Sequence, residues 1–542
     1  MLSILGFLAV LAPLVIVHEL GHFFFAKLFN VKAEVFSVGF GPRLFTRKWG
    51  ETEWCVSAIP LGGYVKLLGE ETESDKPLTE EELKRSLPRQ APWKRFFIFF
   101  GGPLFNFLWA IVVFAVIFVI GEPQVSNVVG RVVEQSIAEK AGLRSGDRIV
   151  SIDGQLTDKW EEVDHYISAH PRQTLNLDVD RAGTGRIVVS VETTATRGFN
   201  HLGEFTTLGA VEGMSEFPRA TTIGVSNPET VAWKAGIRLG YSISEFQGVP
   251  VKTWEEVQAL YQGVTAGTEA SLKLVNQKGK DPVELKLLRA HDTETLTEAT
   301  GMHSSELFVE KVMEKTPAEQ AGMQAGDRLL RVNGKGIYSF IELRNAIQSA
   351  GEAGEVAKVE WERDGKTIAA DITPASTAGT DPALRKVVQH TIGVVPALVR
   401  AEPVLTVLRI LNPITLVYKA TERMLSLTSK NFASIGKMFS GSVSVGTLGG
   451  PILIGKLAGE SLSQGLISFL TMMGILSIGL GVLNVLPVPV LDGGHLLLLA
   501  IEAVRGKPLS LRQMEVLQQV GLALILLLML VVMRNDVLRL VN

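Results

Sequence analysis

Four stretches of the chain are apolar enough to cross a lipid bilayer, which takes about 20 consecutive apolar residues in a helix. The segment between the second and the third has the mixed composition of water-soluble domains. The pattern predicts a polytopic α-helical membrane protein with about four transmembrane helices and a large insertion. The apolar stretches are residues 2 to about 29, 96–120, 466 to about 486 and 520–533.

The first apolar stretch is expected to stay in the mature protein. It has no basic residue before it and no Ala-x-Ala-like cleavage site, both of which are usual in a signal peptide. It also contains His18, Glu19 and His22, which a disposable leader would not need.

The orientation of the chain follows from its basic residues. They concentrate between the first two stretches, which predicts that this loop is cytoplasmic and that the long insertion and the C-terminus are outside. These residues are Lys27, Lys32, Arg43, Arg47, Lys48, Lys66, Lys84, Arg85, Arg89, Lys94 and Arg95.

The insertion contains an internal repeat. Its anchors are Ala141-Gly142, Ala235-Gly236 and Ala321-Gly322, spaced by 94 and then 86 residues. Each anchor has an alanine three residues before it and an aromatic residue nineteen residues after its alanine. The aromatic residues are Trp160, Trp254 and Phe340. A short helix, a turn, a strand and a second helix are therefore expected three times.

The turn in each repeat carries a family resemblance. The first and third copies have Gly146-Asp147 and Gly326-Asp327, whereas the second has Gly240-Tyr241. This pattern resembles the circularly permuted PDZ domains of bacterial proteases, which implies three inserted α+β PDZ-like domains. Their expected ranges are 124–200, 204–292 and 303–376.

A metal-binding motif lies in the first apolar stretch. His18 and His22 are four residues apart, so a helix places both imidazoles on one face, where they can bind one Zn²⁺ with Glu19 beside it as a general base. The alternative is that the motif occurs by chance. Each ionisable group inside a bilayer costs about 2.5–3.5 kcal/mol, so a functional reason for these residues is favoured over chance.

A catalytic zinc usually has three protein ligands. Asp492 is the best candidate for the third ligand. Pro487 and Pro489 interrupt the third apolar stretch just before it, so they can end the helix and let the Asp492 carboxylate turn back toward the metal. His495 is a competing ligand. Asp492 could also be a turn or helix-capping residue, because Asp-Gly-Gly is favourable in turns.

These motifs together resemble the site-2 protease family of intramembrane metalloproteases. The family pattern is His-Glu-x-x-His in an early span and Asn-x-x-Pro-x-Pro-x-Leu-Asp-Gly in a late one. Segments 37–42, 60–65 and 101–106 are also similar to it. The resemblance implies that His18, His22 and Asp492 are the zinc ligands and that Glu19 is the general base.

The resemblance also implies a way of holding the substrate. Asn484, with Pro487 and Pro489, would lie beside the substrate backbone. Residues 51–68 would form a membrane-dipping β-hairpin containing Gly62 and Gly63, which pairs with the substrate as an added strand. A plain surface hairpin and a helix-packing role for Asn484 are the alternatives.

By the same resemblance, the chain is an endopeptidase of the inner membrane that cleaves the transmembrane segments of single-span proteins after external trimming. An anti-sigma factor is the expected substrate, and the PDZ-like domains would be periplasmic, where they could bind peptide C-termini or act as a size filter. The alternatives are a peptidase for signal-peptide remnants and a non-proteolytic membrane-tethered scaffold.

The overall composition adds two exclusions. The formal net charge of −3 gives no reason to expect nucleic acid as a partner. A single cysteine, Cys55, excludes an intramolecular disulfide and is expected to be a structural thiol.

The other expected regions are 1–30 and 96–122 (first two helices), 31–95 (loop and hairpin), 385–462 (juxtamembrane amphipathic region), 463–495 (third span) and 518–534 (fourth).

Overall fold

The structure is a computed structural model that describes residues 2–69, 79–199, 205–276, 282–380, 386–441, 446, 448–507 and 510–541. The chain divides into two compact units. The first combines Met1–Pro123 with Val407–Asn542, and the second is Gln124–Thr406. Both ends of the sequence therefore build one unit, and the repeat-containing insertion builds the other.

The first unit contains four helices that are long and apolar enough to cross a membrane. This confirms the four expected spans, although the fourth helix begins before the predicted residue 518, because the polar residues ahead of its apolar run are also helical. The second span starts at a proline, which suits the first turn of a helix. The four are α1 (Leu2–Leu28), α3 (Pro92–Ile120), α13 (Leu466–Val485) and α15 (Leu511–Val541).

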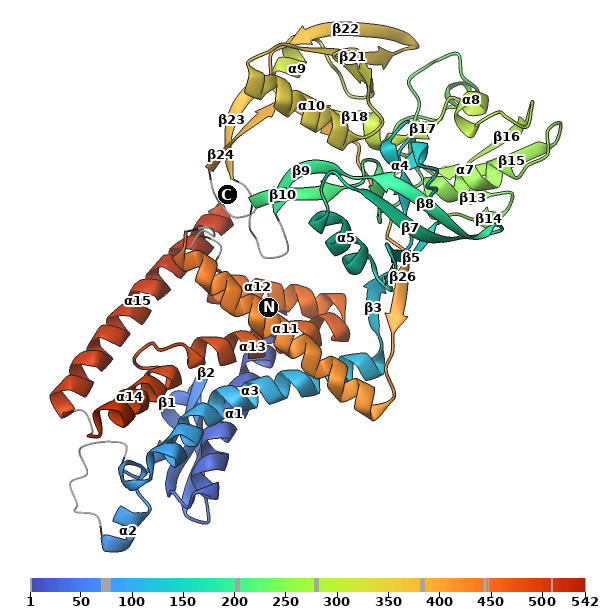
Figure 1. Ribbon diagram of the computed structural model, residues 1–542. Coiled ribbons are helices and arrows are strands. Elements are labelled where there is room, and N and C mark those ends of the chain that lie inside the picture. The colour runs from blue at the N-terminus through green and yellow to red at the C-terminus, as the bar shows by residue number, and fades with distance from the viewer. Residues whose placement is uncertain are drawn as a thin grey trace. The chain divides into compact units, whose positions relative to one another are not determined.

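Further helices and strands complete this unit (Figure 1). They are β1 (Ala33–Trp49), β2 (Thr52–Leu67), α2 (Glu80–Lys84), the 3₁₀ helix Leu87–Arg89, α11 (Pro413–Phe439), α12 (Pro451–Gln464) and α14 (Asp492–Arg505). One apolar core joins α1, α3, α11, α12 and α13, with Phe114, Ala420 and Ala458 fully buried in it. The region expected to be amphipathic helix is helical from Pro413, whereas Leu405–Leu408 is a strand.

The hairpin β1–β2 is curled, so that one segment pairs on both sides. Residues 35–38 of β1 pair with 53–56 and also with 63–66 of β2. The segment that begins at Gly63 is therefore an outer edge of this small sheet. Cys55 is buried within the hairpin, as expected of a structural thiol.

The second unit contains the repeated elements. The first set is β4 (Arg131–Val132), α4 (Ile137–Lys140), β5 (Arg148–Ile152), β6 (Gln155–Leu156), α5 (Trp160–Ala169), β7 (Thr174–Arg181), β8 (Gly185–Glu192), β9 (Thr194–Phe199), β10 (Phe205–Ala210) and β11 (Met214–Ser215). The second set is β12 (Thr222–Gly224), α6 (Val231–Lys234), β13 (Tyr241–Phe246), β14 (Val249–Pro250), α7 (Trp254–Gln262), β15 (Glu269–Val275), β16 (Val283–Leu288), α8 (Leu296–Thr300) and β17 (His303–Ser304).

The third set follows a 3₁₀ helix, Ser305–Leu307. It comprises β18 (Val309–Val312), α9 (Pro317–Gln320), β19 (Arg328–Val332), β20 (Lys335–Gly336), α10 (Phe340–Ala353), β21 (Ala357–Arg363), β22 (Lys366–Ile372), β23 (Ala375–Thr380), β24 (Lys386–Thr391) and β25 (Val394–Pro396). The strands β3 (Glu122–Val125) and β26 (Leu405–Leu408) pair where the chain enters and leaves the insertion.

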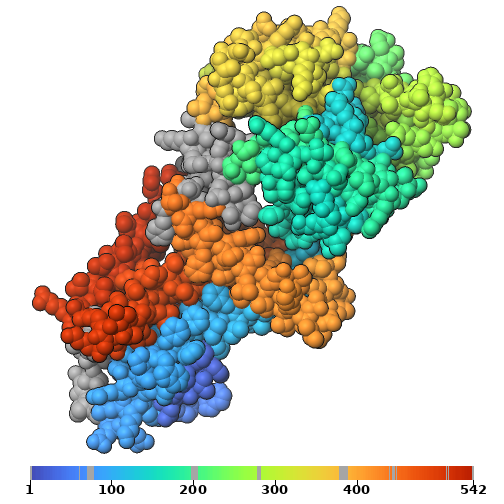
Figure 2. Space-filling model, viewed as in Figure 1, coloured from blue at the N-terminus to red at the C-terminus, as the bar shows by residue number. Residues whose placement is uncertain are grey.

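The repeat predicted from the Ala-Gly anchors recurs in three dimensions. Each set has a four-residue helix with a fully buried alanine, and each longer helix begins at the predicted aromatic residue. Each of the three sets has its own apolar core. In chain order, the three sets are green, yellow-green and yellow in Figure 2. The third core includes Ile392, beyond the expected end at residue 376.

A buried aspartate paired with an arginine explains the Gly-Asp turn of the first and third repeats. Asp147 is buried and receives two hydrogen bonds of 2.7 Å from Arg181, while its Oδ2 also accepts the backbone N–H of Arg144. Asp327 makes the same pair with Arg363. The second repeat has Tyr241 in this place, so its turn is held differently.

A buried carboxylate joins the last helix to α12. Asp536 of α15 is 2% exposed, and its oxygens accept the backbone N–H groups of Gly450, Ile452 and Leu453 at 2.9–3.1 Å. The first turn of α12 cannot satisfy these donors itself. Asp536 therefore caps α12 from another helix.

Replacing Asp536 should destabilise the first unit. We expect Asp536→Ala to lower the free energy of unfolding by at least about 2 kcal/mol, because buried N–H donors lose a charged acceptor. Thermal unfolding in detergent measures this, with the exposed Gln519→Ala on the same helix as control. Equal midpoints for the two variants would contradict the capping role.

Candidate metal centre

The site begins where α1 crosses α3 at very short range. A methyl group at Gly21 would overlap the backbone of Gly101, and one at Gly102 would overlap the imidazole rings of both His18 and His22. Glycine at these positions therefore permits the close approach of the helices. It also leaves the space that the two rings occupy.

The third residue of the site comes from the far end of the chain. After α13 ends at Val485, residues 486–491 form a tight turn, and Asp492 is the first residue of α14. Gly493 has no room for a side chain against the carbonyl of Leu486. Val490 has a φ of 84°, a strained conformation for a β-branched residue. The local backbone is thus tightly constrained beside Asp492.

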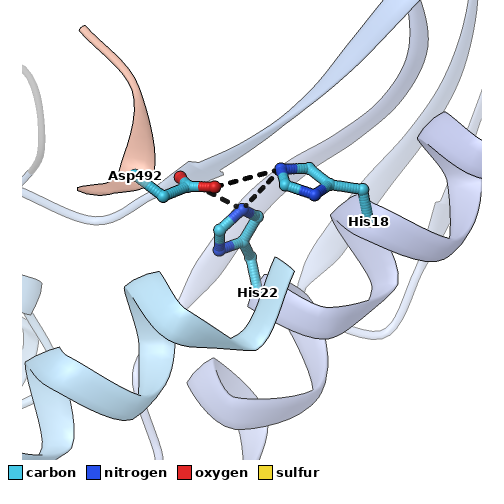
Figure 3. Close-up of side chains that lie close together, drawn as sticks. All are labelled: His18, His22 and Asp492. Carbon is cyan, nitrogen blue, oxygen red and sulfur yellow. Dashed lines mark hydrogen bonds and ion pairs between the residues drawn. The ribbon is translucent and has the colours of Figure 1, made fainter. Parts of the chain in front are cut away.

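These elements bring together three side chains of the types that can bind a metal (Figure 3). Nε2 of His18 lies 3.2 Å from Oδ2 of Asp492, and Nε2 of His22 lies 3.4 Å from its Oδ1. The two Nε2 atoms are 3.3 Å apart. One donor atom from each of the three residues lies within 4.8 Å of the other two, and the three side chains are 11–16% exposed.

The outward-facing nitrogen of each imidazole also has a partner. Nδ1 of His22 lies 2.8 Å from the carbonyl oxygen of Ile98. Nδ1 of His18 lies 3.0 Å from the side-chain amide of the fully buried Asn106. Both rings are thus oriented by α3, and their Nε2 atoms face Asp492.

The residues expected to bind substrate do not all lie at the site. Asn484 reaches the site, with Nδ2 3.5 Å from Nε2 of His18. Gly63 lies beside Glu19, because a Cβ at Gly63 would be 3.0 Å from Cγ of Glu19. Gly62 instead packs against the ring of Phe40.

The two prolines are placed differently from Asn484. Pro487 is exposed. Pro489 packs against Gly521 of α15, where a Cβ would overlap it. The prolines therefore shape the turn before Asp492.

His495, the competing ligand, is engaged elsewhere. Its ring stacks on Phe99, with centroids 4.5 Å apart and an interplanar angle of 8°. Seven residues further along α14, Glu502 pairs with Arg95 at 3.1 Å. Both contacts attach α14 to α3, which fixes the helix that starts at Asp492.

The donor set suits a divalent metal. Two imidazoles and one carboxylate are a common set for catalytic zinc, which keeps a fourth position for water or substrate. Among the described residues, Oδ2 of Asp492 is buried without a hydrogen-bond partner of good geometry, although Nε2 of His18 lies 3.2 Å away. A buried carboxylate oxygen needs such a partner, and a cation between these three groups would supply one.

The family comparison agrees with this chemistry. The model of Peptidase family M50 matches residues 6–528. The chain belongs to peptidase family M50. It is therefore a zinc-dependent metalloendopeptidase of the site-2 protease type, as the motifs predicted.

Several relatives are similar to this M50 protease along its whole length. A protein of Neisseria meningitidis that carries the provisional name of a zinc metalloprotease is 32% identical, covering 100% of both chains. The regulator of sigma E protease of Haemophilus influenzae is 30% identical over 99% of both. RseP of Escherichia coli, a regulator of sigma-E protease, is 29% identical, covering 99% of this chain and 98% of its own.

These findings place the M50 protease in the inner membrane as a multi-pass protein that acts on membrane proteins.

Among solved structures, a PDZ domain of an SdrC-like protein from Listeria monocytogenes is 22% identical, covers 18% of this chain and 90% of its own, and has a TM-score of 0.14. At that score the likeness carries no argument about the fold.

Two residues beside the candidate metal centre were not predicted to belong to it. Asn106 and Gly102 both lie in the segment 101–106, which was noticed for its family resemblance alone. Glycine pairs and a buried polar residue in an apolar span are the signals that could have indicated a close helix crossing.

Filling the space at Gly102 should weaken metal binding. We expect Gly102→Ala to lower zinc affinity about 10-fold or more, because the added methyl group displaces both imidazoles. Zinc content after equilibration with a chelator measures this. Gly479→Ala is the matched control, because a Cβ at Gly479 has no atom within 4 Å among the described residues. Equal zinc retention by both variants would contradict this account.

Proposed function

We propose that His18, His22 and Asp492 bind the catalytic zinc of an endopeptidase that cleaves peptide bonds within the membrane. The convergence of one donor atom from each residue carries this proposal. Two donors come from a helix long and apolar enough to span the bilayer, and the third is the first residue of α14, just after the turn that follows another such helix. When bound there, zinc supplies Lewis-acid polarisation of a carbonyl group and acidifies water.

Glu19 is proposed as the general base. It lies between the two histidines in sequence, and its side chain contacts the edge of the hairpin at Gly63. In this role its carboxylate accepts a proton from the attacking water and later gives it to the leaving amine. Proton transfer at Glu19 thus serves both halves of the hydrolysis.

The hairpin edge is proposed to present the substrate. A transmembrane helix has its backbone groups paired internally, so it must unwind before a peptide bond can be attacked. The edge that begins at Gly63 can hydrogen-bond an unwound segment as an added strand. Because Gly63 also touches Glu19, that strand would lie beside the general base.

Asn484 is proposed to hold the substrate backbone near the metal. Its amide is 3.5 Å from Nε2 of His18 and can donate a hydrogen bond to a substrate carbonyl. Asn484 and the hairpin edge would then hold the scissile segment at two points. Such positioning lowers the entropic cost of reaching the transition state.

The proposed substrate is a single-span membrane protein already trimmed outside the membrane, with an anti-sigma factor as the regulatory case. Relatives named as regulators of sigma-E protease support this assignment. We further infer that the second unit comprises three PDZ-like domains on the periplasmic side, which contact the substrate's exposed end. The three recurring cores support the number, and the basic loop 31–95 supports the orientation.

The experiment that tests the proposal is cleavage of a single-span reporter without an external domain, by the purified protein in detergent. Glu19→Gln should lower the rate about 10²–10⁴-fold while zinc remains bound, because it removes only the general base. Asp492→Ala should lose both zinc and activity. Chelation should abolish cleavage, and added zinc should restore it.

Two outcomes of the same experiment would contradict the proposal. Full activity of Glu19→Gln would exclude this residue as the base. Cleavage that survives chelation would exclude metal catalysis at these residues. If several reporters stay intact while zinc is below stoichiometric, the second unit would next be tested as a peptide-binding scaffold.

A further inference from the structure

Asn106 is a buried polar residue with no assigned role in the chemistry. It lies in α3, its side chain is fully buried, and its amide is 3.0 Å from Nδ1 of His18. Its main-chain oxygen accepts a hydrogen bond of 2.7 Å from the hydroxyl of Ser477, which is also fully buried. Asn106 is therefore fixed between α1 and α13.

His22 shows what a metal-binding imidazole requires at this site. Its Nδ1 faces the carbonyl oxygen of Ile98, which can only accept a hydrogen bond. Nδ1 must therefore carry the hydrogen, so the lone pair of Nε2 is available to a metal. The main chain of α3 thus selects the tautomer of His22.

His18 has the same requirement but a different partner. Its Nε2 faces Asp492 and its Nδ1 faces Asn106. If the amide nitrogen of Asn106 donates to Nδ1, the neutral ring carries its hydrogen on Nε2 and cannot bind a metal there. If the amide oxygen faces Nδ1 instead, Nδ1 donates and Nε2 is free.

The amide of Asn106 can meet this requirement. Among the described residues, its Oδ1 is buried without a hydrogen-bond partner. Rotation of the amide by 180° exchanges oxygen and nitrogen with almost no change in shape, and the two atoms are assigned from their hydrogen bonds. Oδ1 then accepts the hydrogen of Nδ1, which is the arrangement that a metal on Nε2 needs.

We propose that Asn106 is a positioning residue that holds His18 in the tautomer competent to bind zinc. It acts through His18, as the carbonyl of Ile98 acts through His22. The inference rests on the proposed zinc site at His18, His22 and Asp492. It assigns to α3 the orientation of both histidines on α1.

The test compares Asn106→Leu with Asn106→Asp in the full-length protein. Leucine keeps a similar volume but cannot accept a hydrogen bond, so zinc affinity should fall about 10–100-fold. Aspartate keeps the acceptor, so its zinc affinity should stay close to that of the unmutated protein. Competition with a chromogenic chelator measures both affinities.

Two controls separate this role from a structural one. Ser477→Ala removes the hydrogen bond to the main chain of Asn106 without touching the amide, and should leave zinc affinity unchanged. The metal-free Asn106→Leu protein should unfold at a temperature no lower than the metal-free unmutated protein. Added zinc should then raise its midpoint less, because ligand stabilisation scales with affinity.

The outcomes distinguish the two proposals. If Asn106→Leu binds zinc as tightly as the unmutated protein, or Asn106→Asp binds it as weakly as Asn106→Leu, the role of Asn106 is overturned. If the unmutated protein itself fails to retain stoichiometric zinc, or His18→Ala retains it, the proposed zinc site fails first.

Discussion

The close crossing of α1 and α3 is the constraint on which the proposed metal centre depends. Glycines on both helices let the backbones meet at Gly21 and Gly101, and Gly102 leaves the space for the two imidazoles. The crossing also brings the carbonyl of Ile98 and the amide of Asn106 to the outward side of those rings. A larger residue at the crossing would separate the histidines from the groups that orient them.

Ionisable groups in membrane helices need partners within the protein, because the bilayer offers no water. Two examples among the described residues show this. At the metal centre, two histidines and Asp492 face one another across segments more than 460 residues apart. At the other, Asp536 receives the first N–H groups of α12. The contacts of Asp492 with the two histidines thus connect the two terminal parts of the sequence, whereas Asp536 connects two helices of the C-terminal part.

Much of this arrangement could be predicted from the sequence, because hydropathy and motif spacing are local signals. The four spans, the helices that begin at Trp160, Trp254 and Phe340, and the nearness of Asp492 to the histidines all follow the predictions. Asn106 and Gly102 were not predicted, because their roles depend on which faces of two distant helices meet. Strand β26 was missed because Leu405–Leu408 is as apolar as a buried helix segment.

The last helix has little protein around it. In its most apolar window, 6% of α15 is buried among the described residues, which leaves most of that window free to face the lipid of a bilayer. It is attached through Asp536 to α12, and through Gly521 to Pro489, three residues before Asp492. A helix in this situation adjusts its tilt to the thickness of the bilayer. Any change in bilayer thickness that altered the tilt of α15 would therefore reach the turn before Asp492 through the contact of Gly521 with Pro489.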